Sequence, residues 1–341
     1  GISDWFTLRS AHQESILNAF QDLLRRLRPT VVHLHHYAHL GLEIIPAIRR
    51  SLPDVRIVLT LHEMMAICHQ QGQMVKSNSH RLCWRESLDD CARCFPDRRI
   101  EDFWLRKHRF QSIFNLVDHF FTPSAFLRQR YIDWGLEPSR ITVLENGQVP
   151  VGSDAPRPLA SGDTRNRFGF FGQINPFKGV DVLLSGLAAL PKASRRNIQL
   201  EVHGSNLDFQ ALEFKERIAA LRAPLEREGV LRWVGPYEPS QLSERMNGVD
   251  WVLVPSVWWE NSPMVIQEAV MHGRPVIASN IVGMAEKVNE GIDGRHVMVG
   301  NPLAWANMIE SLAGDDAQWQ KLRDGIRLAP DIDRAAAEHL A

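Results

Sequence analysis

The sequence predicts an α/β protein built from two doubly wound parallel sheets. Short apolar runs alternate along the chain with amphipathic stretches of helical period, the rhythm of parallel strands joined by right-handed crossovers. Strand candidates such as residues 250–254 lack polar and apolar alternation, which suits strands covered on both faces. The rhythm stops once, over residues 149–165, which are rich in Pro, Gly, Ser and Asp. These observations indicate two domains joined by a linker.

Before the linker, four apolar runs predict strands and the stretches between them predict helices. The strands are expected at residues 31–35, 56–61, 119–122 and 141–144. The helices are expected at residues 8–27, 42–52, 100–117 and 124–134. A loop over residues 64–96 is rich in Cys, Gln, Ser and His. Its length is unusual for a compact domain, so we expect the loop to be functional or to be stabilised by its own cross-links.

After the linker, the same alternation predicts a longer series of strands. They are expected at residues 167–172, 198–203, 230–234, 250–254, 276–278 and 297–299, with helices at 302–312 and 318–326 closing the series. The predicted domains are therefore 1–148 and 166–330, followed by a tail or helix at 331–341. Because fewer strands precede the linker than follow it, and the chain starts at Gly1 without Met, we expect a fragment whose first domain lacks its opening strands.

Composition excludes several classes of function. Hydrophobic residues make up 44% and charged residues 23% of the 341 residues, as in ordinary globular proteins. The net charge of −1 lacks the excess of basic residues that is typical of nucleic-acid-binding proteins. No apolar run is long enough to span a bilayer and no secretory leader opens the chain, so we expect a cytoplasmic protein. The basic amphipathic stretches 23–28 and 98–109 predict either peripheral contact with the inner face of the membrane or a solvated face.

The most informative stretch follows the strand at residues 250–254. It carries Glu260 and Asn261, then Ser262 as the expected N-cap of a helix with Pro263 just inside. Glu268 lies two turns further on. Free N–H groups at a helix start favour a phosphate, and carboxylates on either side can accept hydrogen bonds from sugar hydroxyls. A nucleotide sugar has this layout, while a solvated helix with an unrelated Glu pair is the alternative that this stretch alone leaves open.

Segments in both halves of the chain match, in order, the pattern of one enzyme family. They lie at residues 59–63, 122–124, 143–147, 171–179, 202–204, 233–237, 250–256 and 260–268. Through them the chain resembles a family 4 glycosyltransferase of the GT-B fold, with two Rossmann-like domains. The resemblance implies retaining, metal-independent transfer of a sugar from a UDP- or GDP-linked donor to a hydroxyl of a glycan or lipid-linked acceptor. It implies no cofactor for catalysis.

The chain departs from the family pattern at two places. We find no counterpart of the family's opening strand and glycine-rich loop, which leaves the activity of the fragment by itself open. Gln173 stands where the family more often has Arg against the donor diphosphate, so this position offers a hydrogen bond without a charge.

The matched positions give the candidate residues their roles. Lys178 would place a cation over the donor diphosphate, Glu260 would contact the transferred sugar, and Glu268 would accept from the ribose hydroxyls. His62 directly follows a buried strand and would face the acceptor and the donor sugar. A solvated lysine and a core histidine are the alternatives. The predicted catalytic residues are His62, Glu260 and Lys178. The predicted donor-binding residues are Gly172, Gln173, Lys178, His203, Gly204, Ser205, Tyr237, Glu260, Asn261, Ser262, Pro263, Met264, Val265 and Glu268.

Two further groups of residues lie in the first domain. His35, His36 and Glu63 are assigned to the acceptor side, and a metal cluster of histidines is disfavoured because no carboxylate lies at ligand spacing among them. Cys91 and Cys94 form a metal knuckle that Cys68 and Cys83 would complete to a Cys₄ set for structural zinc. Unrelated free thiols or a disulfide are the alternatives for these cysteines.

Other functions remain to be separated from glycosyl transfer. An epimerase of the GT-B fold would use the same donor site without an acceptor. A non-catalytic, zinc-stapled binding module would use the Cys-rich loop alone. A dinucleotide oxidoreductase is disfavoured because no G-x-G-x-x-G motif follows a predicted strand.

Overall fold

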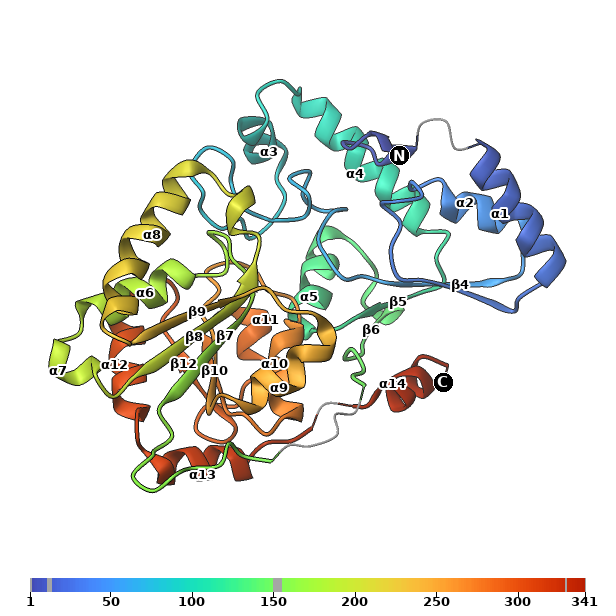
Figure 1. The fold of residues 1–341 in the computed structure, drawn as a ribbon. Coiled ribbons are helices and arrows are strands. Elements are labelled where there is room, and N and C mark those ends of the chain that lie inside the picture. Colours follow the sequence, from blue (N-terminus) through green and yellow to red (C-terminus); the bar gives the residue numbers. More distant parts are fainter. Residues whose placement is uncertain (1, 11–13, 150–154, 329, 341) are drawn as a thin grey trace. The chain divides into compact units, whose positions relative to one another are not determined.

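The computed structural model describes residues 2–10, 14–149, 155–328 and 330–340 (Figure 1). Contacts divide the chain into two units, Gly1–Glu145 and Asn146–Ala341. Each unit contains a parallel sheet, which confirms the predicted fold class. Residues 146–148, which the sequence assigns to the first domain, group with the second unit.

The first unit is built around a parallel sheet of order β3-β4-β5-β6. Its strands are β3 (Val31–Leu34), β4 (Arg56–Thr60), β5 (His119–Thr122) and β6 (Ile141–Val143). Its α-helices are α1 (Glu14–Leu27), α2 (Ile44–Ser51), α3 (Leu88–Cys94), α4 (Ile100–Phe114) and α5 (Ala125–Trp134). α1 packs on α2, and α2 and α3 both contact α4. β1 (Ile2–Asp4) and β2 (Arg9–Ser10) form a separate antiparallel pair that the sequence did not reveal.

The second unit is built around a parallel sheet of order β12-β11-β10-β7-β8-β9. Its strands are β7 (Arg167–Gln173), β8 (Gln199–Ser205), β9 (Leu231–Gly235), β10 (Trp251–Val254), β11 (Val276–Ser279) and β12 (Gly294–Val297). Its α-helices are α6 (Val180–Ala189), α7 (Lys192–Arg195), α8 (Leu212–Arg227), α9 (Leu242–Asn247), α10 (Met264–Met271), α11 (Val282–Ala285), α12 (Pro302–Leu312), α13 (Asp316–Asp324) and α14 (Ile332–Leu340). The strand order reverses between β7 and β10, and open α/β sheets bind ligands at the carboxyl side of such a switch point.

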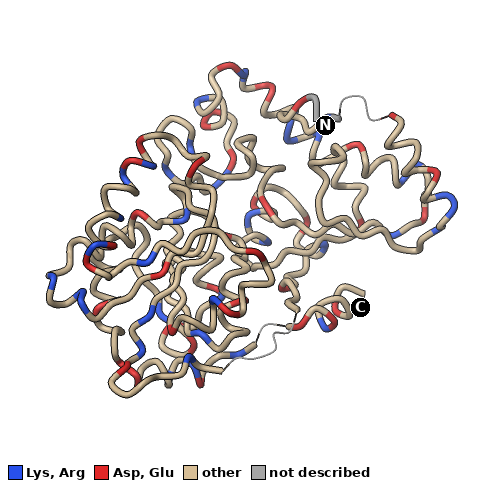
Figure 2. Tube along the Cα trace, in the orientation of Figure 1, with Lys and Arg blue, Asp and Glu red and all other residues tan. Residues whose placement is uncertain are grey.

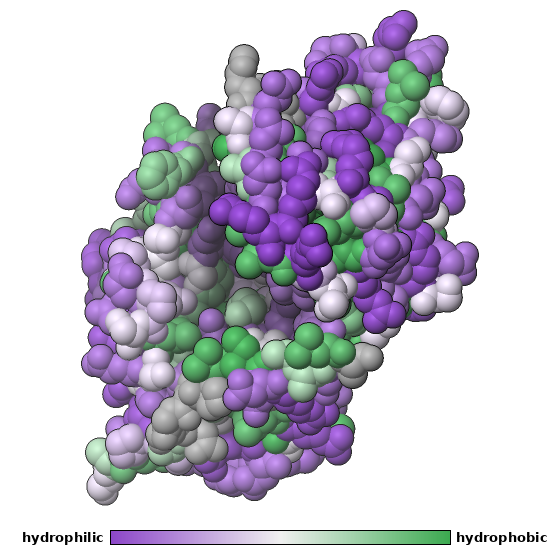
Figure 3. Space-filling model, turned by 90° about the vertical axis from the view of Figure 1, so that its right-hand side faces the viewer, coloured by the Kyte–Doolittle hydropathy of each residue, from purple (hydrophilic) through white to green (hydrophobic). Residues whose placement is uncertain are grey.

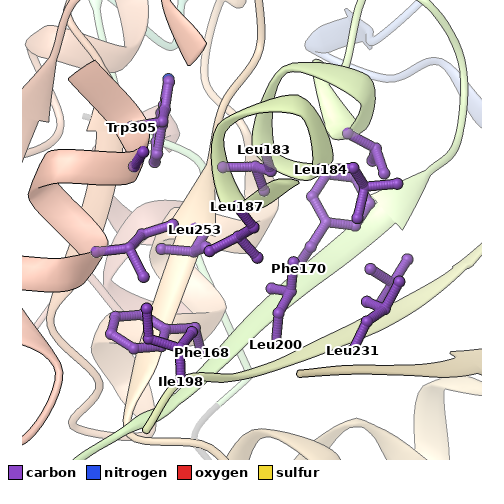
Figure 4. Packing of buried hydrophobic residues seen from close by; sticks show 14 of the residues in the cluster. Phe168, Phe170, Leu183, Leu184, Leu187, Ile198, Leu200, Leu231, Leu253 and Trp305 are labelled. Carbon is purple, nitrogen blue, oxygen red and sulfur yellow. The ribbon is translucent and has the colours of Figure 1, made fainter. Parts of the chain in front are cut away.

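The main core of the second unit lies between its sheet and one layer of helices. Figure 4 shows Leu183, Leu184 and Leu187 of α6 packed against strand residues, with Trp305 of α12 beside them. Helices α6, α8 and α12 cover this face, and α9, α10 and α11 lie over the other (Figure 1). Burial on both faces explains why these strands read as continuous apolar runs.

The described part of the predicted linker is tied to the second unit by a buried carboxylate. Asp250, which is 0% exposed, accepts hydrogen bonds from Arg157 Nη2 at 3.0 Å and Arg165 Nη1 at 2.9 Å. It also accepts from the backbone N–H of Arg167 at 3.0 Å. Residues 150–154 lie outside the described residues. Because a buried charge is stable only when it is paired, the bonds from Arg157 and Arg165 to Asp250 hold residues 155–165 against the second unit.

Several predicted element boundaries are wrong. The helix expected at 8–27 begins at Glu14, and Leu8 is buried before β2, where its carbonyl accepts from the N–H of Leu42 at 3.0 Å. Residues 11–13 lie outside the described residues. The strand expected at 297–299 is β12 (Gly294–Val297), whose polar residues hid the strand pattern. The helix α3 inside the 64–96 loop went unpredicted, although Ser87 caps it.

The surface agrees with the small net charge. Figure 2 shows Lys and Arg interspersed with Asp and Glu along both units. On the face in Figure 3, hydrophobic residues form small areas among hydrophilic ones. Within the described ranges, no helix has the length and apolarity that crossing a membrane requires.

Candidate active site

The carboxyl ends of β7 and β10 support two loops of the second unit at its switch point. The loop after β7 runs to Lys178 and Gly179, and Gly179 is the N-cap of α6. The loop after β10 carries Glu260 and leads into α10. Because β7 and β10 are hydrogen-bonded parallel neighbours, both loops leave the same edge of the sheet.

Backbone and ring contacts join the two loops into one surface. The N–H of Val257 donates to the carbonyl of Phe177 at 2.9 Å, and the rings of Phe177 and Trp258 lie 5.1 Å apart. Gly179 has φ +69°, and a Cβ there would lie 2.1 Å from the carbonyl oxygen of Pro255. Only glycine therefore fits where the loops meet.

The joined loops bring Lys178 and Glu260 together. Lys178 Nζ lies 2.5 Å from Glu260 Oε1, which also accepts from Ser256 Oγ at 2.8 Å and Trp258 Nε1 at 3.2 Å. Glu260 is 8% exposed. At Gly283 a Cβ would lie 2.0 Å from the carbonyl oxygen of Glu260, so α11 supports this loop from behind. Two residues predicted to be catalytic thus form an ion pair at the expected edge.

Sequence reasoning gave no role to Ser256, Trp258 or Gly283. Ser256 follows the carboxyl end of β10 and Trp258 lies two positions before Glu260, which is the signal that was available for them. Nothing in the local sequence indicates Gly283, because its contact with Glu260 depends on packing between segments far apart in the chain.

The helix after Glu260 starts one position later than predicted. α10 begins at Met264, with Pro263 as its N-cap and no side-chain cap hydrogen bond, so the assignment of Ser262 as N-cap is wrong. Proline fits at a helix start because its missing N–H would have no partner there. The half-buried Asn261 and Ser262 lie before the helix, and Met264 and Val265 form its first turn.

Glu268 and Tyr237 lie near each other on the second-unit edge. Burial raises the pKa of Glu268, and burial together with the Glu268 charge raises the pKa of Tyr237 to about 12. The Tyr237 ring meets Phe171 edge-on at 6.0 Å, and the Arg245 guanidinium lies 5.4 Å from the Tyr237 ring centre. Glu268 and Tyr237 together offer a carboxylate that can accept hydrogen bonds from hydroxyls beside an aromatic ring, which suits a nucleoside.

The carboxyl ends of β7 and β8 approach each other closely. At Gly204 a Cβ would lie 2.1 Å from the carbonyl oxygen of Gly172, whose φ is +140°. Gln173 and Ser205 pair in register and are both exposed at this edge. The predicted glycines therefore allow two backbones to meet beside polar side chains.

His203, predicted to bind the donor, is enclosed instead. Its side chain is 1% exposed, its Nε2 lies 3.1 Å from Glu201 Oε2, and its ring stacks on Phe171 at 4.4 Å. Burial lowers its pKa, which favours the neutral ring. The His203 ring therefore packs behind Phe171 and does not line the surface at the carboxyl ends of the strands.

In the first unit, the carboxyl ends of β3 and β4 gather histidines. His35 Nδ1 lies 3.3 Å from His62 Nε2, and His33 Nε2 lies 2.7 Å from Thr60 Oγ1. His36 accepts from the N–H of Ala38 through Nδ1 at 2.9 Å, and burial lowers its pKa. His62 and His35 are therefore brought together as neighbours of one sheet edge.

The side chain of Glu63, which the sequence assigns to the acceptor side, points into the interior of the first unit. Its carboxylate accepts from the backbone N–H of Met65 and from Tyr37 Oη at 3.3 Å, while its carbonyl accepts from Tyr131 Oη at 2.9 Å. Burial raises its pKa to about 7. The buried Arg106 donates to the carbonyls of Met65 and Ala66, which fixes the same stretch. Glu63 is an internal anchor beside His62.

None of the four cysteines of the 64–96 loop forms a disulfide in the described structure, which excludes that alternative there. Within the described residues, no group of three or more His, Cys, Asp or Glu has an arrangement that could hold a metal ion. Burial raises the pKa of Cys68 and Cys83 and that of Cys91 to about 12, so these thiols are protonated at neutral pH. Structural zinc stays a prediction.

Comparison with known proteins places both halves of the chain in one group of enzymes. Residues 5–148 match the model of Glycosyltransferase Family 4, and residues 165–315 match the model of Glycosyl transferases group 1. The chain belongs to glycosyltransferase family 4. This confirms the family that the sequence motifs indicated.

Curated members of the family are longer than this chain. A D-inositol 3-phosphate glycosyltransferase from Corynebacterium glutamicum is 34% identical over 148 residues, covering 43% of this chain and 35% of the relative. One of the same name from Corynebacterium efficiens is 27% identical over 280 residues, covering 78% of this chain and 59% of the relative.

Solved glycosyltransferase structures share the fold. HepE from Anabaena in complex with UDP and glucose is 15% identical with a TM-score of 0.64, over 99% of this chain and 84% of the other. A glycosyltransferase from Rickettsia africae is 17% identical with a TM-score of 0.69, over 96% and 79%. At such identities the likeness shows the fold alone, which is GT-B.

Proposed function

We propose that the chain carries the donor site of a glycosyltransferase that moves a sugar from a nucleotide sugar to an acceptor hydroxyl. The observation that carries the proposal is the Lys178–Glu260 pair, with Nζ 2.5 Å from Oε1, directly before a helix whose first turn has no side-chain cap. A cation and free backbone N–H groups at one helix start suit a diphosphate. Family membership and the UDP-bound HepE structure favour UDP over GDP as the carrier.

Each residue of the second-unit site has a role in this proposal. The N–H groups of Met264 and Val265 hold the diphosphate, with Lys178 and the Gln173 amide beside it. The Glu260 carboxylate binds hydroxyls of the transferred sugar, and Glu268 accepts from the ribose hydroxyls next to Tyr237. Ser256 and Trp258 hold the Glu260 carboxylate in place. His203 keeps Phe171 in position without touching the donor.

The proposed reaction breaks the bond between the sugar's anomeric carbon and the diphosphate oxygen and forms a bond to the acceptor oxygen on the same face. The departing diphosphate gains negative charge, which Lys178 and the helix N–H groups stabilise without a metal ion. The acceptor proton passes to an oxygen of the departing phosphate, and His62 hydrogen-bonds the reacting sugar or acceptor. Configuration is retained because the acceptor enters on the side that the leaving group vacates.

The acceptor class proposed is a glycan or lipid-linked hydroxyl. Relatives named D-inositol 3-phosphate glycosyltransferase make inositol phosphates a first acceptor to test. Peripheral membrane contact is proposed through α1, where Ile16, Leu23 and Leu27 are 50%, 43% and 66% exposed. Arg25 and Arg26 flank this stripe, as in helices that lie on anionic bilayers.

The proposal is tested by calorimetric titration with UDP- and GDP-sugars. We expect the wild type to bind, and Glu268→Gln to bind at least tenfold more weakly because the ribose loses a charged hydrogen-bond acceptor. The control Glu310→Gln, which changes an exposed glutamate on α12, should bind as the wild type does. Binding of neither nucleotide would overturn the donor-site proposal. Equal affinity in Glu268→Gln and wild type would remove the ribose role alone. Product analysis with and without acceptor separates transfer from epimerisation.

A further inference from the structure

The histidine pair at the edge of the first sheet has an in-plane geometry. His35 Nδ1 and His62 Nε2 are 3.3 Å apart, the ring centres are 5.6 Å apart, and the ring planes differ by 19°. The centre-to-centre distance exceeds the nitrogen-to-nitrogen distance by about twice the distance from a ring centre to a ring atom. Both nitrogens therefore lie close to the line joining the ring centres, where a ring N–H of one residue points at the lone pair of the other.

From this geometry we infer that His35 is a positioning residue for His62, fixing its tautomer and making the second protonation of the pair harder than the first. The inference rests on the proposed function only for what it says about turnover. In the neutral pair one nitrogen donates and the other accepts, so the tautomer of each ring determines that of its partner. One added proton gives an imidazolium–imidazole pair with a charge-assisted hydrogen bond. A second added proton turns both nitrogens into donors and breaks the bond.

The surroundings of the pair support this assignment. His62 directly follows buried Leu61 at the end of β4, and the Glu63 anchor fixes the next position. The ring centre of His33 lies 4.3 Å from that of His35 with the planes tilted by 31°, and His33 contacts the buried Thr60 hydroxyl. Among the described residues, the titratable or charged groups near the pair include His33 on β3, His36 and His39 after it, and Glu63, with Tyr37, Tyr131 and Arg106 facing Glu63. His35 is exposed, so it can exchange protons with solvent.

This arrangement resembles the nucleophile–base–orienter logic of other active sites. A base is effective when a third group holds its ring in one tautomer and stabilises the charge it acquires. His35 supplies both functions to His62 through the shared hydrogen bond. In the proposed reaction the pair would hold the His62 ring in the one tautomer that hydrogen-bonds the reacting sugar or acceptor.

Ring NMR tests the inference without needing turnover. We titrate the histidine ¹⁵N and Cε1–H signals of the wild type, His35→Asn, His35→Leu and the control His119→Gln, a residue of β5 whose ring bonds Thr142. In the wild type the pair should titrate in two macroscopic steps separated by more than about one pH unit. His35→Asn keeps a polar atom near the Nδ1 position, so His62 should keep its tautomer but titrate in one step. His35→Leu should give a mixture of His62 tautomers.

Kinetics then separate positioning from folding. In His35→Leu we expect kcat to fall by roughly ten- to a hundredfold with donor KM unchanged, and partial recovery in His35→Asn at alkaline pH. His119→Gln should match the wild type in both assays. Identical His62 titrations in the wild type and His35→Leu overturn the inference, and so does equal kcat. Coupled titrations in a protein that transfers no sugar would overturn the proposed function and leave the pair intact.

Discussion

The junction of the Lys178 and Glu260 loops depends on one glycine. Gly179 has φ +69°, and a Cβ would lie 2.1 Å from the carbonyl oxygen and 2.9 Å from the carbonyl carbon of Pro255. Gly229, at the end of α8, has φ +73° and nothing within 4 Å of the same position. The substitutions Gly179→Ala and Gly229→Ala therefore impose the same backbone conformation on alanine, and only the first adds a collision.

The two substitutions should have clearly different effects on the free energy of unfolding. A left-handed alanine costs about 1 kcal/mol, which is the whole effect expected for Gly229→Ala. In Gly179→Ala the loops must also separate, which breaks the bond from Val257 N–H to the Phe177 carbonyl and pulls Lys178 from buried Glu260. Together we expect a loss of about 3–5 kcal/mol.

Urea denaturation of both variants and the wild type measures the difference, and titration with UDP shows whether the site is affected. Gly179→Ala should lose more than about tenfold in affinity, because a displacement of the Lys178 loop costs the diphosphate its cation. Gly229→Ala should bind as the wild type does. If both variants lose the same stability and keep the same affinity, the contact between the two loops does not organise the site.

Three further outcomes follow from the structure. The pKa of Glu63 is raised from 4.5 to about 7, so its contribution to stability is full below pH 4.5 and is lost as the pH rises to about 7. Over that window the unfolding free energy of the wild type should fall by about 1–3 kcal/mol relative to Glu63→Gln. Parallel curves of unfolding free energy against pH for the two proteins would contradict this. Zinc binding by the four cysteines would require their thiols to move from the positions seen in the structure. If they do so, elemental analysis of protein purified without chelators should give one zinc per chain, lost in Cys91→Ser, and background zinc in the wild type would reject the Cys₄ site. Anionic vesicles should sediment the wild type but not Leu23→Asp with Leu27→Asp, while Leu212→Asp, an equally exposed leucine of α8, should still bind.

Much of the fold could be predicted because its strands are buried on both faces. Trp251, Val252, Leu253 and Val254 are all buried, so β10 reads as an unbroken apolar run. Elements without that signal were missed or misplaced. β12 carries Arg295 and His296 within the strand, and α3 is a short helix with no buried residues.

The candidate site could be predicted only where it is local in sequence. Lys178, Glu260 and Glu268 belong to contiguous motifs at the carboxyl ends of neighbouring strands, so their place at one edge of the sheet could be predicted, while their roles came from the family resemblance and stay predictions. The supports of Glu260 depend on packing, and Gly283 lies more than twenty positions after Glu260. The family pattern placed His203 and Glu63 in the site, but burial decides whether such a side chain faces a ligand.

The two units use buried polarity in different ways. In the second unit Glu260 is 8% exposed, and its carboxylate is paired with Lys178 and accepts from Ser256 and Trp258. In the first unit burial raises the pKa of Glu63 to about 7, although the hydrogen bond from Tyr37 and the nearby charge of Arg106 act in the opposite direction. The proposed donor would therefore meet a buried ion pair in the second unit, whereas we expect the first-unit edge to respond to protons, through Glu63 and the His35–His62 pair.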